Sequence, residues 1–333
     1  MKRFTKTILC LCIAATIAVP AYAWEVQEPV VTLSDEAHVY DVLPGTTEWN
    51  ELEPKERYKA CAVSESEVQS MTTRALVETV LNYPYLINIY AYDSLPLGIE
   101  AVSEYFPGLQ ELLNRNDAIG ALEEYLASRV AVQSVGEADL TLYDAQTLMG
   151  FISMSQGQLN GVNATSATYD TVSTPNGSEV EVIVDMNWRE VSNHIGAWPA
   201  LSFNMALAQS EQMEDVYPSA TLSRDPAPNY NCHSYAWYST SSSNKYWMDD
   251  PSLYISDGSY ESHTTTVGCK VTYQRVSDDA YIHSGIIIAT PGGPATVSSK
   301  WGALGVFTHD IDDCPYTAGE TGTSMIMNVW DRA

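Results

Sequence analysis

Basic residues are scarce in this chain of 333 residues, which contains 16 Lys and Arg against 42 Asp and Glu. The net charge of −26 at pH 7 repels phosphate backbones and anionic lipid. We therefore expect no nucleic-acid partner and no binding to an anionic membrane surface or wall polymer. The hydrophobic share of 45% is ordinary and is sufficient for a folded core.

Long apolar runs are missing beyond the N-terminus. The run Ile8–Val19 has about a dozen residues, whereas a bilayer-spanning helix needs roughly 20. This run follows the basic Lys2, Arg3 and Lys6 and precedes a small-x-small cleavage site that ends at Ala23. The order is typical of a secretory signal peptide. We predict cleavage after Ala23, no membrane insertion, and a secreted, extracellular mature chain with a net charge of −29.

Cysteines are few, and the mature chain has no Cys-x-x-Cys pair of the kind that often binds structural zinc. Four cysteines follow the signal: Cys61, Cys232, Cys269 and Cys314. In an exported protein they predict two disulfides, for which three pairings exist. A working thiol at Cys232 would leave at most one disulfide among the other three, and the sequence leaves this choice open.

The mature chain of about 310 residues is long enough for two domains and predicts an α+β protein. The helical pattern begins at Ser64, which forms a capping-box spacing with Glu67. Strand alternation begins at Val180. The predicted parts are the signal peptide (1–23), an extended acidic lead-in (24–60), an α-helical domain (61–155), a linker (156–178) and a second, α+β domain (179–333). No cluster of catalytic residue types occurs in the helical domain, so we assign it no chemistry.

The segment 229–237, with the sequence NYNCHSYAW, carries the main chemical signal. Asn231 is a good helix N-cap, which places Cys232 in the first turn of a helix. The partial positive charge and free amides of a helix start stabilise a thiolate, so we expect a thiol pKa below about 8.5. The backbone amides around Asn231 and His233 are candidates for holding a developing oxyanion.

A thiol nucleophile needs an imidazole to accept and return its proton, and His283 is the best candidate. The segment 281–288 predicts a buried strand, in which Gly285 leaves space beside His283. Residues 290–294 predict a turn, and residues 295–301 predict a returning strand. A cysteine on a helix start is therefore followed, about 50 residues later, by a histidine on a strand of a hairpin.

This order resembles the CHAP and NlpC types of the papain-like cysteine hydrolase superfamily. Asn231-Cys232-His233-Ser234 is similar to their nucleophile motif, and His283-Ser284-Gly285-Ile286 is similar to their histidine strand. The resemblance covers about residues 226–310. It implies a papain-like domain and a peptidase or amidase that cleaves bonds in peptides or peptidoglycan fragments without a metal or cofactor.

A third polar residue normally orients the histidine of such a pair through its other ring nitrogen. The returning strand offers Ser298, Ser299 and Lys300, none of which is a strong acceptor. We therefore expect His309 to fill this role, as the third catalytic residue beside Cys232 and His283. Four aromatic residues are candidates for lining a substrate cleft, although packing explains them almost as well. They are Trp237, Tyr246, Trp247 and Trp301.

Two other interpretations compete with the hydrolase. In the first, Cys232 is half of a disulfide and the chain is a non-catalytic binding or adhesion module with an aromatic recognition loop. In the second, Cys232, His233, His283 and His309 bind a metal, as in a metal-dependent hydrolase. A free-thiol count and a metal analysis would separate these interpretations.

Overall fold

Helices predominate among the described residues between Thr47 and Ser155. The computed structural model describes residues 33–130, 139–157, 167–317 and 325–333. The predicted signal peptide therefore lies outside the described residues. The helical elements of this part are α1 (Thr47–Glu51), α2 (Pro54–Ala60), α3 (Glu65–Ser70), α4 (Thr73–Leu81), η1 (Leu86–Tyr90), α5 (Leu95–Tyr105), α6 (Pro107–Asn114), α7 (Ala118–Val130) and α8 (Leu140–Ser155).

The helix starts show which local predictions were sound. Ser64 caps α3 by accepting a hydrogen bond from the amide of Glu67, which is the first half of the predicted capping box, but the return contact from the Glu67 carboxylate is not present at this helix start. The Glu67 carboxylate lies 2.7 Å from Nδ1 of His38. The segment 24–60 was expected to be extended, but α1 and α2 lie within it. Pro54 occupies the first turn of α2, where a missing N–H costs nothing, and Glu53 forms a capping box there.

Two antiparallel sheets follow the helices. A small sheet has the order β1-β2-β4, and a seven-stranded sheet has the order β3-β9-β8-β7-β6-β10-β5. Strand β1 falls within the segment 156–178 that was predicted to be a linker. The strands are β1 (Tyr169–Ser173), β2 (Glu179–Val184), β3 (Thr221–Arg224), β4 (Tyr246–Trp247), β5 (Tyr260–Ser262), β6 (Lys270–Arg275), β7 (Tyr281–Ala289), β8 (Thr296–Lys300), β9 (Val306–Asp310) and β10 (Met325–Arg332).

The hairpin of β7 and β8 confirms the strands predicted around His283. The two strands pair antiparallel, with Ile287 opposite Val297. A Cβ atom added to Gly285 would come within 2.5 Å of Val297, so glycine allows the close approach of β8. Side chains alternate along β7, and Ser284 and His283 therefore project to opposite faces of the large sheet.

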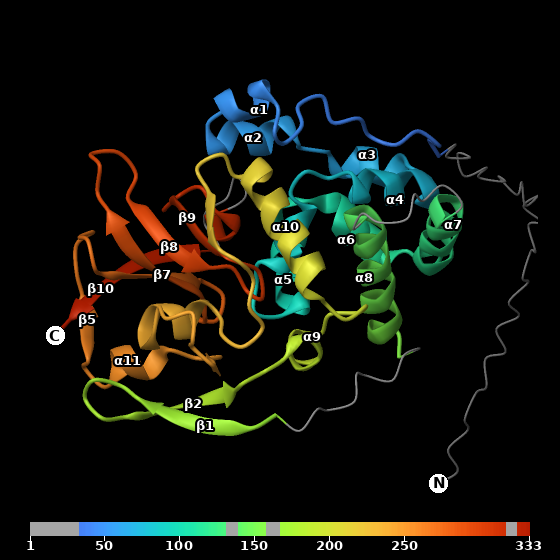
Figure 1. Cartoon of the computed structure of the whole chain (residues 1–333). Coiled ribbons are helices and arrows are strands. Elements are labelled where there is room, and N and C mark those ends of the chain that lie inside the picture. Colours follow the sequence, from blue (N-terminus) through green and yellow to red (C-terminus); the bar gives the residue numbers. More distant parts are fainter. Residues whose placement is uncertain (1–32, 131–138, 158–166, 318–324) are drawn as a thin grey trace, which may run out of the picture. The chain divides into compact units, whose positions relative to one another are not determined.

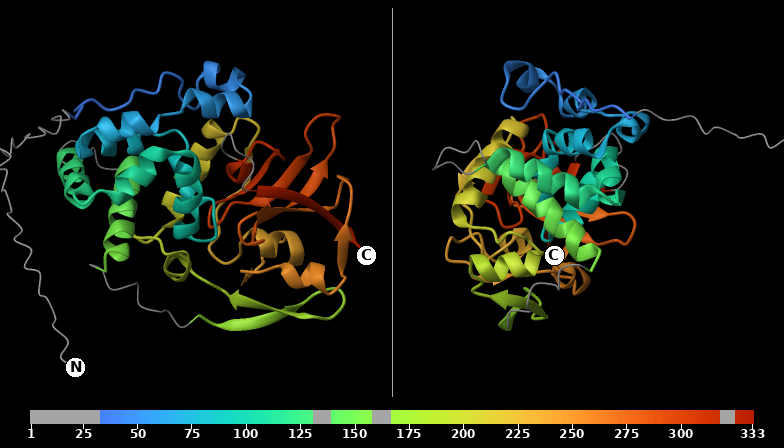
Figure 2. Two further views of the ribbon diagram at one scale, coloured as in Figure 1. Left: turned by 180° about the vertical axis from the view of Figure 1, so that it is seen from behind. Right: turned by 90° about the vertical axis from the view of Figure 1, so that its right-hand side faces the viewer.

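A shared hydrophobic core joins the helices to one face of the large sheet. Helices α9 (Trp188–Ile195) and α10 (Phe203–Val216) follow β2. Figure 1 shows α10 between α8 and the strands β8 and β9, and Figure 2 shows the molecule from behind and from one side. The core includes Leu148 of α8 and Phe307 of β9. Residues Leu33–Ala333 form one compact unit by their contacts.

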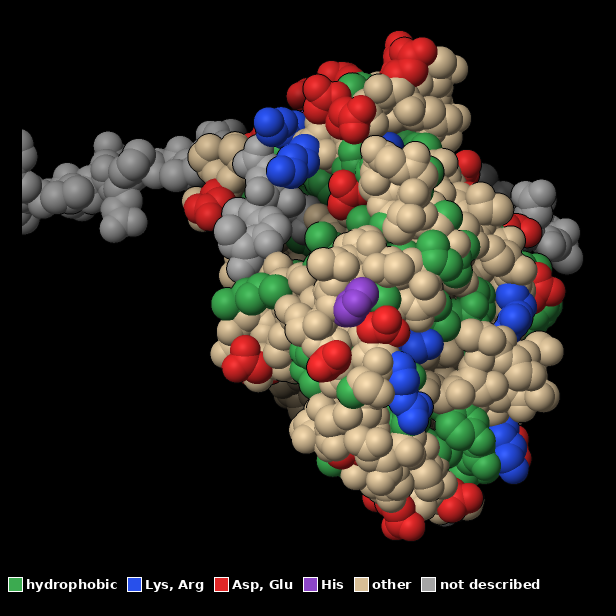
Figure 3. Space-filling view, turned by 90° about the vertical axis from the view of Figure 1, so that its left-hand side faces the viewer, with side chains coloured by type: hydrophobic (Ala, Val, Ile, Leu, Met, Phe, Trp, Pro, Cys, Tyr) green, Lys and Arg blue, Asp and Glu red, His purple; other side chains and the backbone are tan. Residues whose placement is uncertain are grey.

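The molecule is mixed α+β, with a helical first half and antiparallel sheets in its second half. No helix among the described residues is long and apolar enough to cross a bilayer. On the face shown in Figure 3, charged side chains are scattered among uncharged polar and apolar ones.

Candidate active site around Cys232

The turn that carries Cys232 is fixed by Asn231. Oδ1 of Asn231 accepts hydrogen bonds from the amide of Ser234 at 3.2 Å and from the amide of Met248 at 3.1 Å. Asn231 is therefore the predicted cap, and it also ties the turn to the chain near β4. The helix continues as the π-helical turn η2 (Ser234–Tyr238), which packs on β7 and β8. Wide turns of this kind are frequent at functional sites.

Asp93 brings a carboxylate to Cys232 from the helical half of the chain. It lies in the loop between η1 and α5, where the sequence suggested no chemistry. The Cys232 thiol donates to Oδ2 of Asp93 over 3.6 Å, and Nδ2 of Asn231 donates to the same oxygen at 2.8 Å. The sequence did not predict this contact, because tertiary structure joins residues 139 positions apart. We find no signal in the local sequence of Asp93 that predicts this contact.

His233 completes the group of side chains around the thiol. Its Nδ1 lies 2.8 Å from Oγ of Ser284, which also accepts a hydrogen bond from Nε1 of Trp237 at 2.9 Å. This contact leaves Nε2 of His233 facing Oδ2 of Asp93 at 3.8 Å. The ligand atoms of Asp93, Cys232 and His233 all lie within 4.8 Å of one another.

Burial controls the protonation of this group. It raises the pKa of the Cys232 thiol well above 9, and the neighbouring Asp93 raises it further. Our expectation of a lowered thiol pKa was wrong for this conformation, because the helix start does not compensate for complete burial. Burial also raises the pKa of Asp93 to about 7 and lowers the pKa of His233 to about 4. Cys232 and His233 are therefore both neutral at pH 7.

His283 and His309 are near each other but have different contacts. The His283 ring stacks on Tyr316 at 3.6 Å between centroids, and neither of its nitrogens has a hydrogen-bond partner. Burial holds its pKa well below 6.5. Both nitrogens of His309 are engaged, Nε2 with Oγ of Ser299 at 2.9 Å and Nδ1 with the carbonyl of Asp310 at 2.8 Å. His309 therefore does not hydrogen-bond to His283 in this structure.

Lys300 stabilises the loop after β8. Its ammonium is buried and donates to the carbonyls of Gly302 at 2.7 Å and Leu304 at 2.9 Å. It also lies 5.1 Å from the centre of the Tyr230 ring. Burial lowers the pKa of Lys300 to about 7, while Asp93 and Cys232 raise it. A buried cation is thus near the thiol, in the strand where an orienting acceptor was sought.

The aromatic residues proposed for a cleft divide between packing and a surface pocket. Trp237 and Trp301 are buried and donate to Ser284 and Ser299. Tyr246 is half-buried and contacts Tyr238 edge to face. Trp247 alone of the four lines the pocket described next, and its Nε1 donates to Oδ1 of Asp249 at 3.1 Å.

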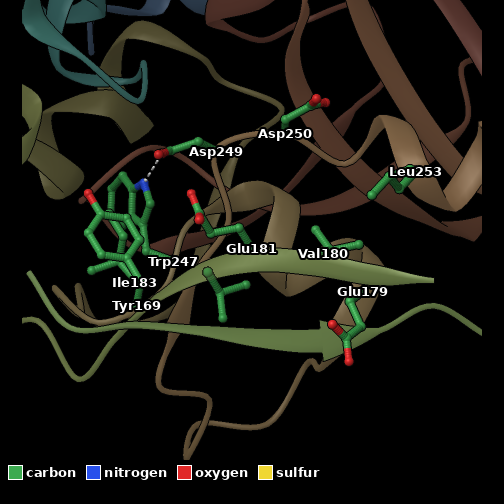
Figure 4. A pocket seen from close by; sticks show the side chains of 10 residues that line it. Tyr169, Glu179, Val180, Glu181, Ile183, Trp247, Asp249, Asp250 and Leu253 are labelled. Atoms are coloured by element: carbon green, nitrogen blue, oxygen red, sulfur yellow. Dashed lines mark hydrogen bonds between the residues drawn. The ribbon is translucent and has the colours of Figure 1, made fainter. Parts of the chain in front are cut away.

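A pocket of about 370 Å³ lies over the small sheet, and it combines apolar and acidic side chains. Figure 4 shows Tyr169, Ile183 and Trp247 gathered at one end. The pocket is lined by Tyr169, Glu179, Val180, Glu181, Val182, Ile183, Trp247, Asp249, Asp250 and Leu253. Asp249 follows Met248, which pairs with Asn231, so the pocket is close in the chain to the turn of Cys232.

All four cysteines of the described chain are unbridged and buried. The two disulfides predicted from four cysteines in an exported chain are therefore not formed, and the thiol of Cys232 is free. Two groups of side chains offer at least three metal-binding atoms each within the described residues. One is Asp93, Cys232 and His233, and the other is His263, Cys269 and Asp331. The first differs from the set suggested by sequence, because Asp93 stands in place of His283 and His309.

No protein-family model, curated protein or solved structure matches this chain. Inference about its function therefore begins with the geometry around Cys232 and with the two short motifs that contain Cys232 and His283.

Proposed function

We propose that this protein is a secreted cysteine peptidase or amidase that cleaves amide bonds in peptides or peptidoglycan-type fragments. In this proposal the region from about 226 to 310 acts as a papain-like hydrolase domain. Cys232 is the nucleophile and His283 is the proton acceptor. The buried and unbridged state of Cys232 favours this function over the binding module, which required bridged cysteines.

The contact between the Cys232 turn and β7 carries the proposal. The backbone of Ser284 lies close enough to Sγ of Cys232 to lower the pKa of that thiol, so the thiol is near the strand beside His283. His283 is completely buried, yet both of its ring nitrogens lack partners. A buried imidazole without hydrogen bonds is costly, and such groups concentrate at functional sites.

The resting pair is a neutral thiol and a neutral imidazole, so proton transfer accompanies attack. The His283 ring stacks on Tyr316 and projects to the face of the sheet opposite Ser284, so it must first move to reach the thiol and accept its proton. Sγ then bonds to the carbonyl carbon, and amides at the helix start stabilise the oxyanion. The C–N bond breaks as His283 returns the proton to the leaving amine. Water, activated by the same imidazole, hydrolyses the thioester and releases the acid.

His233 is the rival for the role of base. Its Nε2 faces Cys232, and its Nδ1 is oriented by Ser284, as expected of a catalytic imidazole. We assign the role to His283 because its nitrogens have no competing partner and because it occupies the position of the histidine in the resemblance. His233 also faces the Asp93 carboxylate, which the proton transfer does not use.

The acidic pocket suggests the charge of the preferred substrate. Glu179, Glu181, Asp249 and Asp250 line it together with Trp247. A peptide with lysine or another amine-bearing residue near the cleaved bond complements this lining better than an acidic one. The aromatic surface of Trp247 would contact the aliphatic part of such a side chain.

The test is hydrolysis of internally quenched peptides that differ only in carrying lysine or glutamate around the central bond. We expect the wild-type chain and Cys269→Ala to hydrolyse the lysine peptides, and Cys232→Ala and His283→Ala to be inactive. Full activity of Cys232→Ala, full activity of both His283→Ala and His233→Ala, or no hydrolysis by the folded wild-type chain would refute the proposal. A His283→Ala variant that keeps activity, beside an inactive His233→Ala variant, would transfer the role of base to His233.

A further inference from the structure

We propose that Asp93, Cys232 and His233 form a binding site for a divalent metal ion of the zinc class. The three side chains contribute a carboxylate oxygen, a thiolate sulfur and an imidazole nitrogen, which are common zinc ligands. Three protein ligands leave one position of a tetrahedral ion open for water or another small molecule.

The distances between the ligand atoms already fit such an ion. Tetrahedral zinc bonds of about 2.0–2.3 Å place two ligand atoms roughly 3.3–3.5 Å apart. Oδ2 of Asp93 lies 3.6 Å from Sγ of Cys232 and 3.8 Å from Nε2 of His233. All three atoms lie within 4.8 Å of one another. The ligands therefore need to move only by small amounts to surround a cation.

Neighbouring residues hold the ligands in the orientation that coordination requires. Ser284 engages Nδ1 of His233, which turns Nε2 toward the other two ligands. Asn231 donates to the carboxylate of Asp93. Contacts of this kind, from the far nitrogen of a histidine and to a ligating carboxylate, accompany metal ligands in proteins. Oδ1 of Asp93 is buried and has no hydrogen-bond partner, so the carboxylate retains unused binding capacity.

Charge gives a second reason for a cation. Desolvation disfavours the charged forms of both Asp93 and Cys232, and the nearby Lys300 offsets this cost only in part. A divalent ion would neutralise a carboxylate and a thiolate together. Metal binding would then release the thiol proton, and apparent affinity would rise with pH.

The second group of potential ligands, His263, Cys269 and Asp331, lacks these supports. His263 is exposed, and its Nδ1 lies 2.9 Å from the carbonyl of Thr264 and 3.7 Å from Sγ of Cys269. Nδ1 of His263 therefore contacts the backbone of the residue that follows it as well as the thiol. This group provides the matched control for the buried site.

Occupation of the site would regulate the proposed hydrolase. A metal-bound thiolate is unavailable for attack on a carbonyl carbon, so zinc would inhibit turnover reversibly and a chelator would restore it. This consequence rests on the proposed function, whereas metal binding itself does not.

The decisive experiment is a titration of the purified chain with Co²⁺, followed by the thiolate-to-cobalt charge-transfer absorption. We expect one equivalent to give the band and Zn²⁺ to displace it. Cys232→Ser should abolish the band, Asp93→Asn and His233→Ala should weaken binding at least about tenfold, and Cys269→Ser should change nothing. Circular dichroism of each variant shows that it is folded.

Three results would overturn the site. They are the absence of a band in folded wild-type protein at millimolar Co²⁺, a band that survives Cys232→Ser, and a band lost only in Cys269→Ser. The readout does not use turnover, so the two proposals fail separately. A band that depends on Cys232 in a chain that hydrolyses no peptide would support the metal site and refute the hydrolase.

Discussion

Two places in this molecule bring together an aspartate, a cysteine and a histidine, and they differ in depth and support. Asp93, Cys232 and His233 meet between the helical half and the large sheet, where the cysteine and histidine are buried. His263, Cys269 and Asp331 meet at the β5, β6 and β10 edge, where the histidine is exposed.

The comparison shows that residue types alone do not define a site. The buried histidine is held by Ser284, a residue of a different element, whereas the exposed one contacts the backbone of the residue that follows it. Burial raises the pKa of both thiols, and a neighbouring carboxylate adds to the effect in each case, Asp93 at Cys232 and Asp331 at Cys269. The chemistry therefore depends on what surrounds the three side chains.

Replacing each cysteine gives the largest expected contrast. Cys232→Ala should lower the rate of peptide hydrolysis by more than about a thousandfold, because removal of a nucleophile disables the whole catalytic unit. Cys269→Ala should leave the rate within about twofold of wild type. Initial rates at several enzyme concentrations measure both effects. Equal losses of activity in the two variants would contradict the assignment of Cys232, rather than Cys269, as the nucleophile.

Replacing Ser284 tests the support of the buried group. Ser284→Ala leaves Nδ1 of His233 and Nε1 of Trp237 without their partner, at an expected cost of about 2 kcal/mol or more in unfolding free energy. Ser298→Ala is the matched control, since Ser298 has one such contact, with the Tyr235 hydroxyl. Urea denaturation measures both variants. A smaller loss for Ser284→Ala than for Ser298→Ala would contradict the role of Ser284.

Replacing Asp93 by asparagine tests its effect on the thiol. Above pH 7 Asp93 is largely ionised and raises the pKa of Cys232, so the amide should lower that pKa. A fall of one unit would increase the thiolate fraction, and with it the alkylation rate at pH 8.5, about tenfold. Site-resolved mass spectrometry measures the rate for Cys232, with Cys269 as the internal reference. Slower labelling of Cys232 in the variant would disprove the electrostatic argument.

Asp144 is a buried carboxylate outside the proposed site and serves as a comparison for Asp93. Its pKa is also raised to about 7, but it contacts Tyr90 and no cysteine. The folded chain retains the Asp144 proton between pH 3.8 and about 7, so its contribution to stability falls as the pH rises through this range. Asp144→Asn does not titrate, so its stability relative to wild type should rise between pH 4 and pH 8, by about 4 kcal/mol at most.

Thermal unfolding at pH 4 and pH 8 measures this effect. Asp144→Asn should also hydrolyse peptides at the wild-type rate, since Asp144 contacts Tyr90 and lies outside the group around Cys232. A pH-independent difference in stability would show that Asp144 is not the titrating group.

Local sequence was sufficient for the parts of the site that local contacts determine. Asn231 caps the turn of Cys232, and the β7–β8 hairpin follows from alternating residues and the turn between them. Helices α1 and α2 were missed because each is only one or two turns long and shows no hydrophobic period. Strand β1 was missed because its Ser- and Thr-rich surroundings indicate a loop.

The rest of the site depends on contacts that no short segment contains. Asp93 reaches Cys232 across 139 residues of sequence, so its role has no local spacing. The thiol pKa was expected to fall because the helix start was visible in the sequence and the burial was not. The free state of the four cysteines likewise follows from where the fold places them.

The register of β6 and β7 has one irregularity, and it lies beside His283. Tyr273 pairs with His283 and Gln274 pairs with Tyr281, so Ile282 is an extra residue on β7. Such a bulge absorbs a change of one residue without turning the following side chains to the other face of the sheet. The connection from Val276 to Ala280 can therefore gain or lose residues during evolution while His283 keeps its orientation, which makes this hairpin the natural place for length variation near the site.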